Sequence, residues 1–179
     1  MNIEMIVRQY NFNLEYATQL VADLTKDQMT QIPTKGLENH PAFTLGHLIS
    51  GSADLNRDLG GDFSMPDAWA DLFIRSGPGD PRKPDPDTEK YPSKNLLLEE
   101  LENQHTKVVS RLRSMDENEL LNSHLKWRFG NFMPSLYDVV IFMCINHEAM
   151  HLGQLAAWRR SMGLDSALAK IDHLKKPYH

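Results

Sequence analysis

Four stretches of the sequence repeat their apolar residues at spacings of three and four, and this periodicity constrains the fold more than any other feature. Such spacing places apolar side chains on one face of an α-helix and is typical of helices that pack at a shallow angle in a bundle. No stretch shows the period-two alternation of a half-buried strand. The sequence therefore predicts an all-α fold, a four-helix bundle. The four apolar seams run from Ile3 to Leu24, Leu45 to Leu59, Leu98 to Met115 and Leu136 to Ala157, and the last includes His147, Met150 and Gln154.

Local signals predict where these helices begin. Pro41 suits the first position of a helix because a proline lacks the N–H that would be unpaired there. Serine, asparagine and similar residues just before such positions can accept hydrogen bonds from the first free N–H groups. The predicted caps are Asn39 or His40 for the second helix, Ser93 for the third and Ser135 for the fourth.

The connection between the second and third predicted helices is long and rich in proline and glycine. Six of the ten prolines lie between Pro66 and Pro92, with Gly77-Pro78-Gly79-Asp80-Pro81 at the centre. A connection of this length is uncommon in a compact domain unless it is functional or must span a long distance. It can run the length of a helix of about 30 Å, so the second and third helices can be parallel and joined by a crossover. Within it, only Pro66 to Phe73 is predicted to be helical.

Residues 116–134 are predicted to form another connection, with a short helical turn from Glu117 to Leu121. This connection carries three large aromatic side chains, Trp127, Phe129 and Phe132. Because aromatic side chains bury a large apolar area, we expect all three to fold back onto the bundle as a lid.

Length and composition predict one domain, residues 1–179, with a single core. The net charge of −5, without a clustered basic face, argues against a nucleic-acid partner. A single cysteine, Cys144, excludes an intramolecular disulfide and fits a reducing compartment. No apolar run approaches the roughly 20 residues of a membrane span, and the first residues lack the apolar core of a signal peptide. We therefore expect a cytoplasmic protein without a membrane partner.

The last predicted helix carries two histidines, His147 and His151, at a spacing of four. On a helix these side chains lie on one face, about 5–6 Å apart at Cβ, which allows both imidazoles to bind one metal ion. With Glu148 between them they also match His-Glu-x-x-His, the motif in which zinc metalloproteases use the glutamate as a base. The absence of strands that could align a peptide, and of the extended His-x-x-Gly-x-x-His continuation, argues against a protease.

The spacing alone is a weak signal, because eight histidines in a chain of this length produce such a pair by chance in roughly one sequence in three. Its place on a predicted core-facing seam strengthens it, since buried polar groups must be satisfied and a metal ion satisfies two imidazoles at once. His47 can supply a third ligand if the second helix packs against the last one. The plainer alternative for His47 is a boundary histidine bonded to a neighbour. Three histidines with an open fourth position are typical of catalytic zinc.

His105 occupies a seam position where an aliphatic residue is expected. It can be a further ligand, a residue that orients a ligand, or a core histidine satisfied by a neighbour, and the last of these is favoured. Two other residues beside the histidine pair have open roles. Gln154, one turn beyond His151, could orient a ligand or substrate, and Glu148 could act as a base if it faces a cavity.

Two motifs in this order resemble the DinB-like (YfiT-like) superfamily. The first is Leu45-Gly46-His47-Leu48, following Asn39-His40-Pro41, and the second is the run from His147 to Leu155, His-Glu-Ala-Met-His-Leu-Gly-Gln-Leu. The likeness covers nearly the whole chain. It implies a four-helix bundle of up-down-down-up order, a homodimer, and a divalent metal ion, zinc or nickel, held by His47, His147 and His151.

Members of that superfamily with an assigned activity look like metal-dependent transferases that act with low-molecular-weight thiols such as bacillithiol or mycothiol. The resemblance therefore implies a thiol S-transferase or a hydrolase that acts on a small-molecule substrate at the three histidines. The alternative is a non-catalytic, stress-related bundle in which the ion is structural and its coordination sphere is closed. An open cavity beside the ion, lined by the proline-rich connection and the loop from Trp127 to Phe132, would argue against that alternative.

Overall fold

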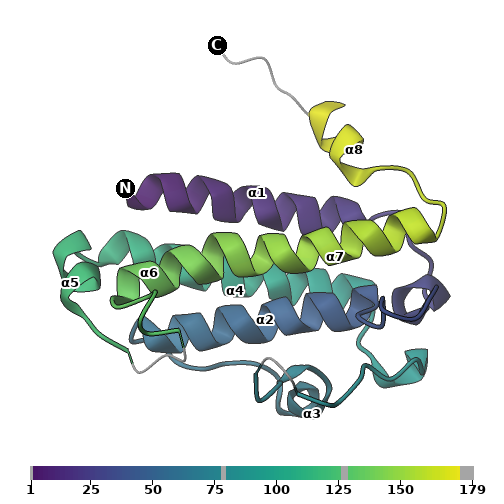
Figure 1. Cartoon of the computed structure of the whole chain (residues 1–179), viewed down its shortest axis with the longest axis horizontal. Helices are drawn as coiled ribbons and strands as arrows, with labels where there is room; N and C mark the ends of the chain where they lie inside the picture. Colours follow the sequence, from purple (N-terminus) through teal and green to yellow (C-terminus); the bar gives the residue numbers. More distant parts are fainter. Residues whose placement is uncertain (1, 78–79, 126–128, 174–179) are drawn as a thin grey trace.

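Long helices packed side by side make up the body of the molecule (Figure 1). The computed structural model describes residues 2–77, 80–125 and 129–173, and it contains no strand within them. The all-α prediction is confirmed. No helix in the described part of the chain is both long and apolar enough to span a lipid bilayer. The long helical segments are α1 (Ile3–Val21), α2 (Pro41–Asp58), α4 (Lys94–Ser114) and the continuous run of α6 (Leu136–Ile141), η4 (Phe142–His147) and α7 (Glu148–Ser161).

Side-chain caps determine where these helices begin, at the positions that the sequence predicts. His40 caps α2, and its Nδ1 accepts a hydrogen bond from the backbone N–H of Phe43 at 3.2 Å. Ser93 caps α4, and Ser135 forms a reciprocal capping box with Asp138 at the start of α6. Each cap satisfies N–H groups that the first turn of a helix leaves unpaired.

Helix α2 lies against both α4 and α7, and α1 also contacts α4 and α7. Apolar side chains from these helices fill the space between them and form two neighbouring core clusters. In both clusters the central side chains have almost no exposed surface, among them Leu45, Leu101 and Trp158 in one and Ile6, Val108 and Val140 in the other. This packing places one face of α2 opposite one face of the last helical run.

The connection between α2 and α4 contains η2 (Asp67–Trp69), α3 (Ala70–Phe73) and η3 (Thr88–Lys90). The first two correspond to the helical stretch predicted before Phe73. Phe73 is fully buried against α2 at Gly46, where an added Cβ would lie 2.2 Å from the phenylalanine ring. Gly46 therefore provides the space that anchors this connection beside α2 (Figure 1). Two further helices are α5 (Glu117–Asn122) and α8 (Ala167–His173), and α8 packs on α1.

The last helical run contains a wide turn that the apolar pattern does not reveal. Residues Phe142–His147 form a π-helix, whose hydrogen bonds span one residue more than those of an α-helix. One extra residue rotates the following helix by about 100°, so its buried face shifts by one position. Met150 and Gln154, expected on the buried seam, are exposed, and Glu148 and Leu152 are buried instead.

The aromatic lid is only partly present. Phe129 faces the bundle, with its ring centroid 5.9 Å from that of Phe142. The prediction is wrong for Phe132, whose side chain is 86% exposed. The chain reverses direction in a turn closed by a hydrogen bond from the Phe132 N–H to the Phe129 carbonyl, so the two rings do not share a face. Trp127, the third predicted lid residue, lies outside the described residues.

Candidate metal centre

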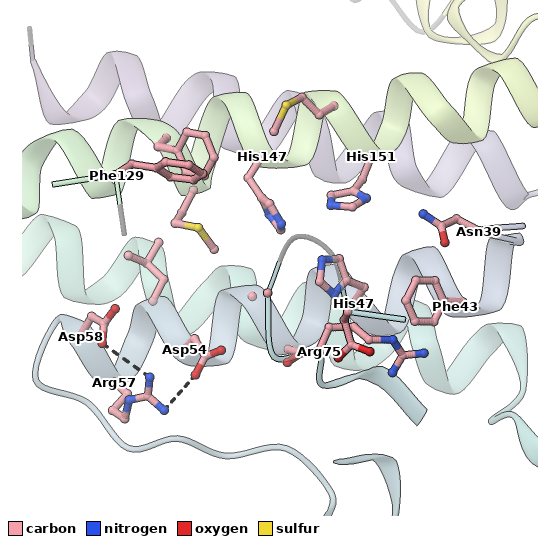
Figure 2. A pocket seen from close by; sticks show the side chains of 18 of the residues that line it. Asn39, Phe43, His47, Asp54, Arg57, Asp58, Arg75, Phe129, His147 and His151 are labelled. Atoms are coloured by element: carbon pink, nitrogen blue, oxygen red, sulfur yellow. Dashed lines mark ion pairs between the residues drawn. The ribbon is translucent and has the colours of Figure 1, made fainter. Parts of the chain in front are cut away.

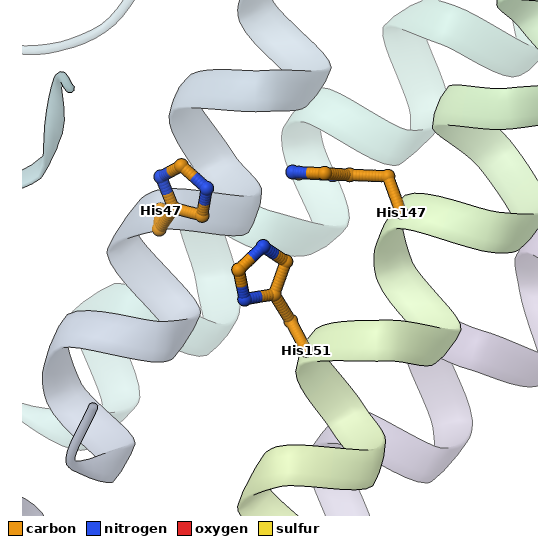
Figure 3. A group of neighbouring side chains, drawn as sticks. All are labelled: His47, His147 and His151. Carbon is orange, nitrogen blue, oxygen red and sulfur yellow. The ribbon is translucent and has the colours of Figure 1, made fainter. Parts of the chain in front are cut away.

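Two helical segments bring three histidine side chains together (Figure 3). His47 lies on α2, His147 ends η4, and His151 follows one turn later on α7. The ring centroids of His147 and His151 are 4.6 Å apart, and that of His47 lies 5.3 and 4.6 Å from them. Each side chain offers one nitrogen within 4.8 Å of the others. These are the three residues that the sequence singles out as candidate ligands.

The geometry and the unpaired atoms of this cluster fit a divalent cation. Two nitrogens that bind one ion at about 2.1 Å lie no more than about 4.2 Å apart, so small ring rotations are enough to close the site. Nδ1 of His47 and Nδ1 of His151 are buried without a hydrogen-bond partner in the described part of the chain. A buried polar atom without a partner destabilises the folded state, and coordination would remove that cost.

Burial favours the uncharged form of two of these imidazoles. It lowers the pKa of His151 to about 4, an effect to which His47 adds and which the side chain of Gln154 opposes. It also lowers the pKa of His47, against the opposing effect of the Phe73 backbone. Because a neutral imidazole is the form that binds a metal ion, these side chains are ready to coordinate at neutral pH.

The close approach of α2 to the last helical run depends on Gly51. A Cβ at this position would lie 3.3 Å from both Cε1 of His147 and Cε of Met143. The wide turn that ends at His147 is supported from α1, because Asn13 donates a hydrogen bond through Nδ2 to the Cys144 carbonyl at 3.1 Å. Three segments far apart in sequence therefore determine the position of His147.

Glu148 does not join the cluster, although it directly follows His147. It is buried in the bundle, where its Oε1 is 2.7 Å from Nε2 of His105, and the His105 ring stacks on Tyr10 with centroids 3.6 Å apart. Burial raises the pKa of Glu148, and His105 opposes that increase. His105 is thus a core histidine bonded to a neighbour, outside the cluster. Glu148 is engaged there and is not among the described residues that line the cavity next to the histidines.

A cavity of about 520 Å³ opens beside the three histidines (Figure 2). Its volume is in the range of small-molecule sites, about 300–1,000 Å³. The connection after α3 and the loop containing Phe129 both contribute to its walls, as expected for an open site. The apolar lining includes Phe43, Leu55, Phe129, Phe142, Met143 and Met150, and among the described residues the charged lining consists of Asp54, Arg57, Asp58, Arg75, Asp80 and Arg82.

Sequence reasoning missed the charged lining for two different reasons. Asp54 and Asp58 follow His47 at helical spacings of seven and eleven, so extending the histidine face along α2 would have identified them. Arg75 lies in an irregular connection, where no periodicity indicates which way a side chain points. Gln154 accepts a hydrogen bond from Asn39 at 3.2 Å. Asn39 lines the cavity, so this pair lies at the border of the cavity.

The fold and the cluster define an all-helical protein with a three-histidine candidate metal centre beside a cavity. A model of the DinB superfamily matches residues 9–155, which include all three histidines. The chain therefore belongs to the DinB superfamily. Neither the comparison with curated proteins nor the comparison with solved structures gave a match.

Proposed function

We propose that this protein is a metal-dependent enzyme that binds one divalent cation, zinc or nickel, through His47, His147 and His151. The observation that carries the proposal is the cavity of about 520 Å³ next to the cluster. A structural zinc ion is enclosed by four protein ligands, whereas a catalytic one keeps a position open. No further histidine, cysteine or carboxylate joins the cluster within the described residues, so a small molecule can complete the coordination from the cavity.

The reaction that we propose is transfer of a low-molecular-weight thiol to a small electrophile, with hydrolysis as the alternative reaction. When bound, the cation supplies a Lewis acid that favours the thiolate form of a thiol or lowers the pKa of a water molecule. The histidines supply neutral donor nitrogens, and Phe43 and Phe142 give the cavity beside them an apolar wall. Support for a thiol comes from the resemblance of both histidine motifs to superfamily members that act with thiols.

We also propose the up-down-down-up order of a four-helix bundle for the long helices. Its support is the packing of α2 along α4 and the position of the connecting segment, which contains α3, on the outside of α2 (Figure 1). A parallel pair of neighbouring helices needs such a crossover, because a short hairpin can join only antiparallel neighbours.

Titration of the metal-free full-length protein with Co²⁺, followed by visible absorption, tests the metal site. Wild type should bind one equivalent. Because residues that only orient a ligand already contribute about 10–100-fold to metal affinity, His47→Ala should lower the affinity by more than about 100-fold. His124→Ala is the matched control, since His124 is exposed and bonded to the Pro134 carbonyl away from the cluster. Equal binding by wild type and His47→Ala would contradict the proposed site.

The reaction is tested by a screen of electrophiles with several small thiols, using metal-loaded wild type and His47→Ala. Thiol-dependent turnover in the wild type that disappears in the variant is expected. A wild type that consumes no thiol but releases hydrolysis products would favour the hydrolase instead.

A further inference from the structure

We infer that Arg75 is the anion-binding end of the cavity, so that the thiol held at the three histidines carries a carboxylate. The inference rests on the proposed function and deepens it by naming a substrate class. Arg75 follows α3 in the connection between α2 and α4, and Figure 2 shows its side chain beside His47 and Phe43.

The ring of Phe43 contacts both the guanidinium of Arg75 and a candidate metal ligand, His47. Cζ of Arg75 lies 4.6 Å from the centroid of the Phe43 ring. That ring in turn stacks on the imidazole of His47, with centroids 5.8 Å apart and an interplanar angle of 10°. A small molecule that contacts both the guanidinium and the histidine cluster therefore passes along the face of the cavity that Phe43 lines.

The contacts of Arg75 leave one edge of the guanidinium available. Nη1 donates to the carbonyls of Leu72 and Ile74, both at 3.1 Å, and these two bonds use both of its hydrogens. The N–H groups of Nε and Nη2 make no hydrogen bond within the described residues, and no carboxylate there forms an ion pair with Arg75. The Nε–Nη2 edge is the two-pronged donor that binds a carboxylate through two parallel hydrogen bonds.

The acidic side chains of the cavity are engaged elsewhere. Asp80, the acidic side chain of this connection that lines the cavity, accepts hydrogen bonds from Arg82 Nε at 3.0 Å and Arg82 Nη2 at 2.6 Å, and from the Ser76 N–H at 2.9 Å. These bonds, chiefly those from Arg82, hold the pKa of Asp80 well below its usual range. Asp80 is thus already neutralised by Arg82 and leaves Arg75 for a ligand.

The opposite end of the cavity repels an anion. There Asp54 and Asp58 share one cation, Arg57 (Figure 2). Nη1 of Arg57 lies 2.8 Å from Oδ1 of Asp54, and its Nη2 lies 3.7 Å from Oδ1 of Asp58. Two carboxylates against one guanidinium leave a net negative charge, so a ligand carboxylate is unfavourable at that end. The charges of the cavity therefore direct the carboxylate end of a ligand towards Arg75 and leave its other end at the histidines.

The test uses the Co²⁺-loaded full-length protein and thiols whose other end is either an acid or its amide. The probes are mercaptoacetate, 3-mercaptopropionate and 4-mercaptobutyrate, each paired with its amide, and the absorption of cobalt reports thiolate binding. The wild type should bind the acid of best length at least about tenfold more tightly than its amide, the size expected of a charged hydrogen-bonded pair. Arg75→Gln should bring that ratio to about one.

Arg57→Gln is the matched control, because it removes the same charge from the opposite end of the same cavity. It should keep the preference for the acid. Arg75→Lys, which retains the charge but loses the two-pronged edge, should give an intermediate ratio. It also serves as the second variant if Arg75→Gln does not fold, and a ratio equal to that of wild type would then overturn the inference.

Equal binding of acid and amide by the wild type, or a preference that survives in Arg75→Gln, would overturn the anion site while the cobalt site stands. A purely structural Arg75 would weaken the binding of acid and amide alike and leave the ratio unchanged, which also overturns it. Failure of the wild type to bind cobalt, or to bind any of the thiols, would instead contradict the proposed function and remove the inference with it.

Discussion

His147 and Glu148 are neighbours in sequence, yet they face different parts of the molecule. Successive residues on a helix point about 100° apart, so a ligand on the cavity side leaves the next residue turned towards the core. There Glu148 pairs with His105. In the protease motif both the histidine and the glutamate act at one metal ion, and this arrangement does not bring them together. We therefore expect Glu148 to stabilise the folded protein through its pair with His105.

Glu148→Gln tests that role. The change replaces the carboxyl partner of His105 with an amide in a buried site, and it should lower the free energy of unfolding by about 1–3 kcal/mol. Cobalt binding should remain at one equivalent, because the three candidate ligands are untouched. Urea unfolding and cobalt titration measure the two quantities. A variant as stable as the wild type that no longer binds cobalt would show that Glu148 acts at the metal centre.

His40 makes stability depend on pH. Burial lowers its pKa to about 4, and its Nδ1 accepts the capping bond from Phe43. In the unfolded chain the pKa of a histidine is about 6.5, so the unfolded state takes up the proton first as the pH falls. The stabilisation is therefore complete above about pH 6.5 and is lost towards pH 4.

In the metal-free protein, each histidine with a pKa near 4 should lower the free energy of unfolding by about 2 kcal/mol when the pH falls from 7 to 5. His40→Asn retains a capping side chain that does not titrate in this range. Urea unfolding at the two pH values should show that the variant loses about 2 kcal/mol less than the wild type. Equal losses would mean that His40 is not responsible for the acid sensitivity.

At the scale of elements, the placement of the candidate centre depends on two departures from regular helix packing. The π-turn from Phe142 to His147 shifts the buried face of α7 by one residue, and this is why Met150 and Gln154 are exposed. Gly46 admits Phe73, which holds the connection containing Arg75 against α2. Neither departure changes the helical class, and each brings side chains to the cavity.

The packing of α3 on α2 is tested by a pair of glycine variants. Gly46→Ala should destabilise the protein by about 1–3 kcal/mol, as overpacking in a core does, because the new Cβ would lie 2.2 Å from the Phe73 ring. Gly153→Ala is the matched control on α7, where nothing lies within 4 Å of the added Cβ, and it should stabilise by about 0.4–1 kcal/mol. Chemical denaturation measures both. A neutral Gly46→Ala would argue against the contact.

At the scale of the whole molecule, the apolar core and the candidate centre are separate sources of stability. Both core clusters are formed by apolar side chains from the long helices, whereas the three histidines border the cavity. Removal of the metal should therefore leave the helices folded. This outcome distinguishes an enzyme from the alternative in which the ion is structural.

Chelation is the corresponding test. With the cation present at about 100 times its Kd, binding stabilises by roughly 2.7 kcal/mol, so its removal should lower Tm by about 5–10 °C for a chain of this size. The far-ultraviolet circular dichroism at 25 °C should not change. His47→Ala should show no shift of Tm with the metal. Unfolding of the wild type on chelation at 25 °C would favour the structural ion.

The sequence by itself determined the helical class, the starts of three of the long helices and the identity of the three histidines. Apolar periodicity, capping residues and the spacing of His147 and His151 are local properties, so they can be recognised without knowing which segments meet. His47 needed one further assumption, that α2 packs on the last helix, and the structure brings the two together.

Only the tertiary structure decided the rest. The π-turn depends on contacts such as the bond from Asn13 on α1, the pair formed by Glu148 and His105 joins two helices, and the exposure of Phe132 depends on a loop turn. The free edge of Arg75 is evident only once Asp80 is seen to bond Arg82. Most of these features involve residues far apart in sequence or in irregular segments, where no local period specifies a direction. For that physical reason the fold class was predictable, whereas the position of Arg75 in the cavity was not.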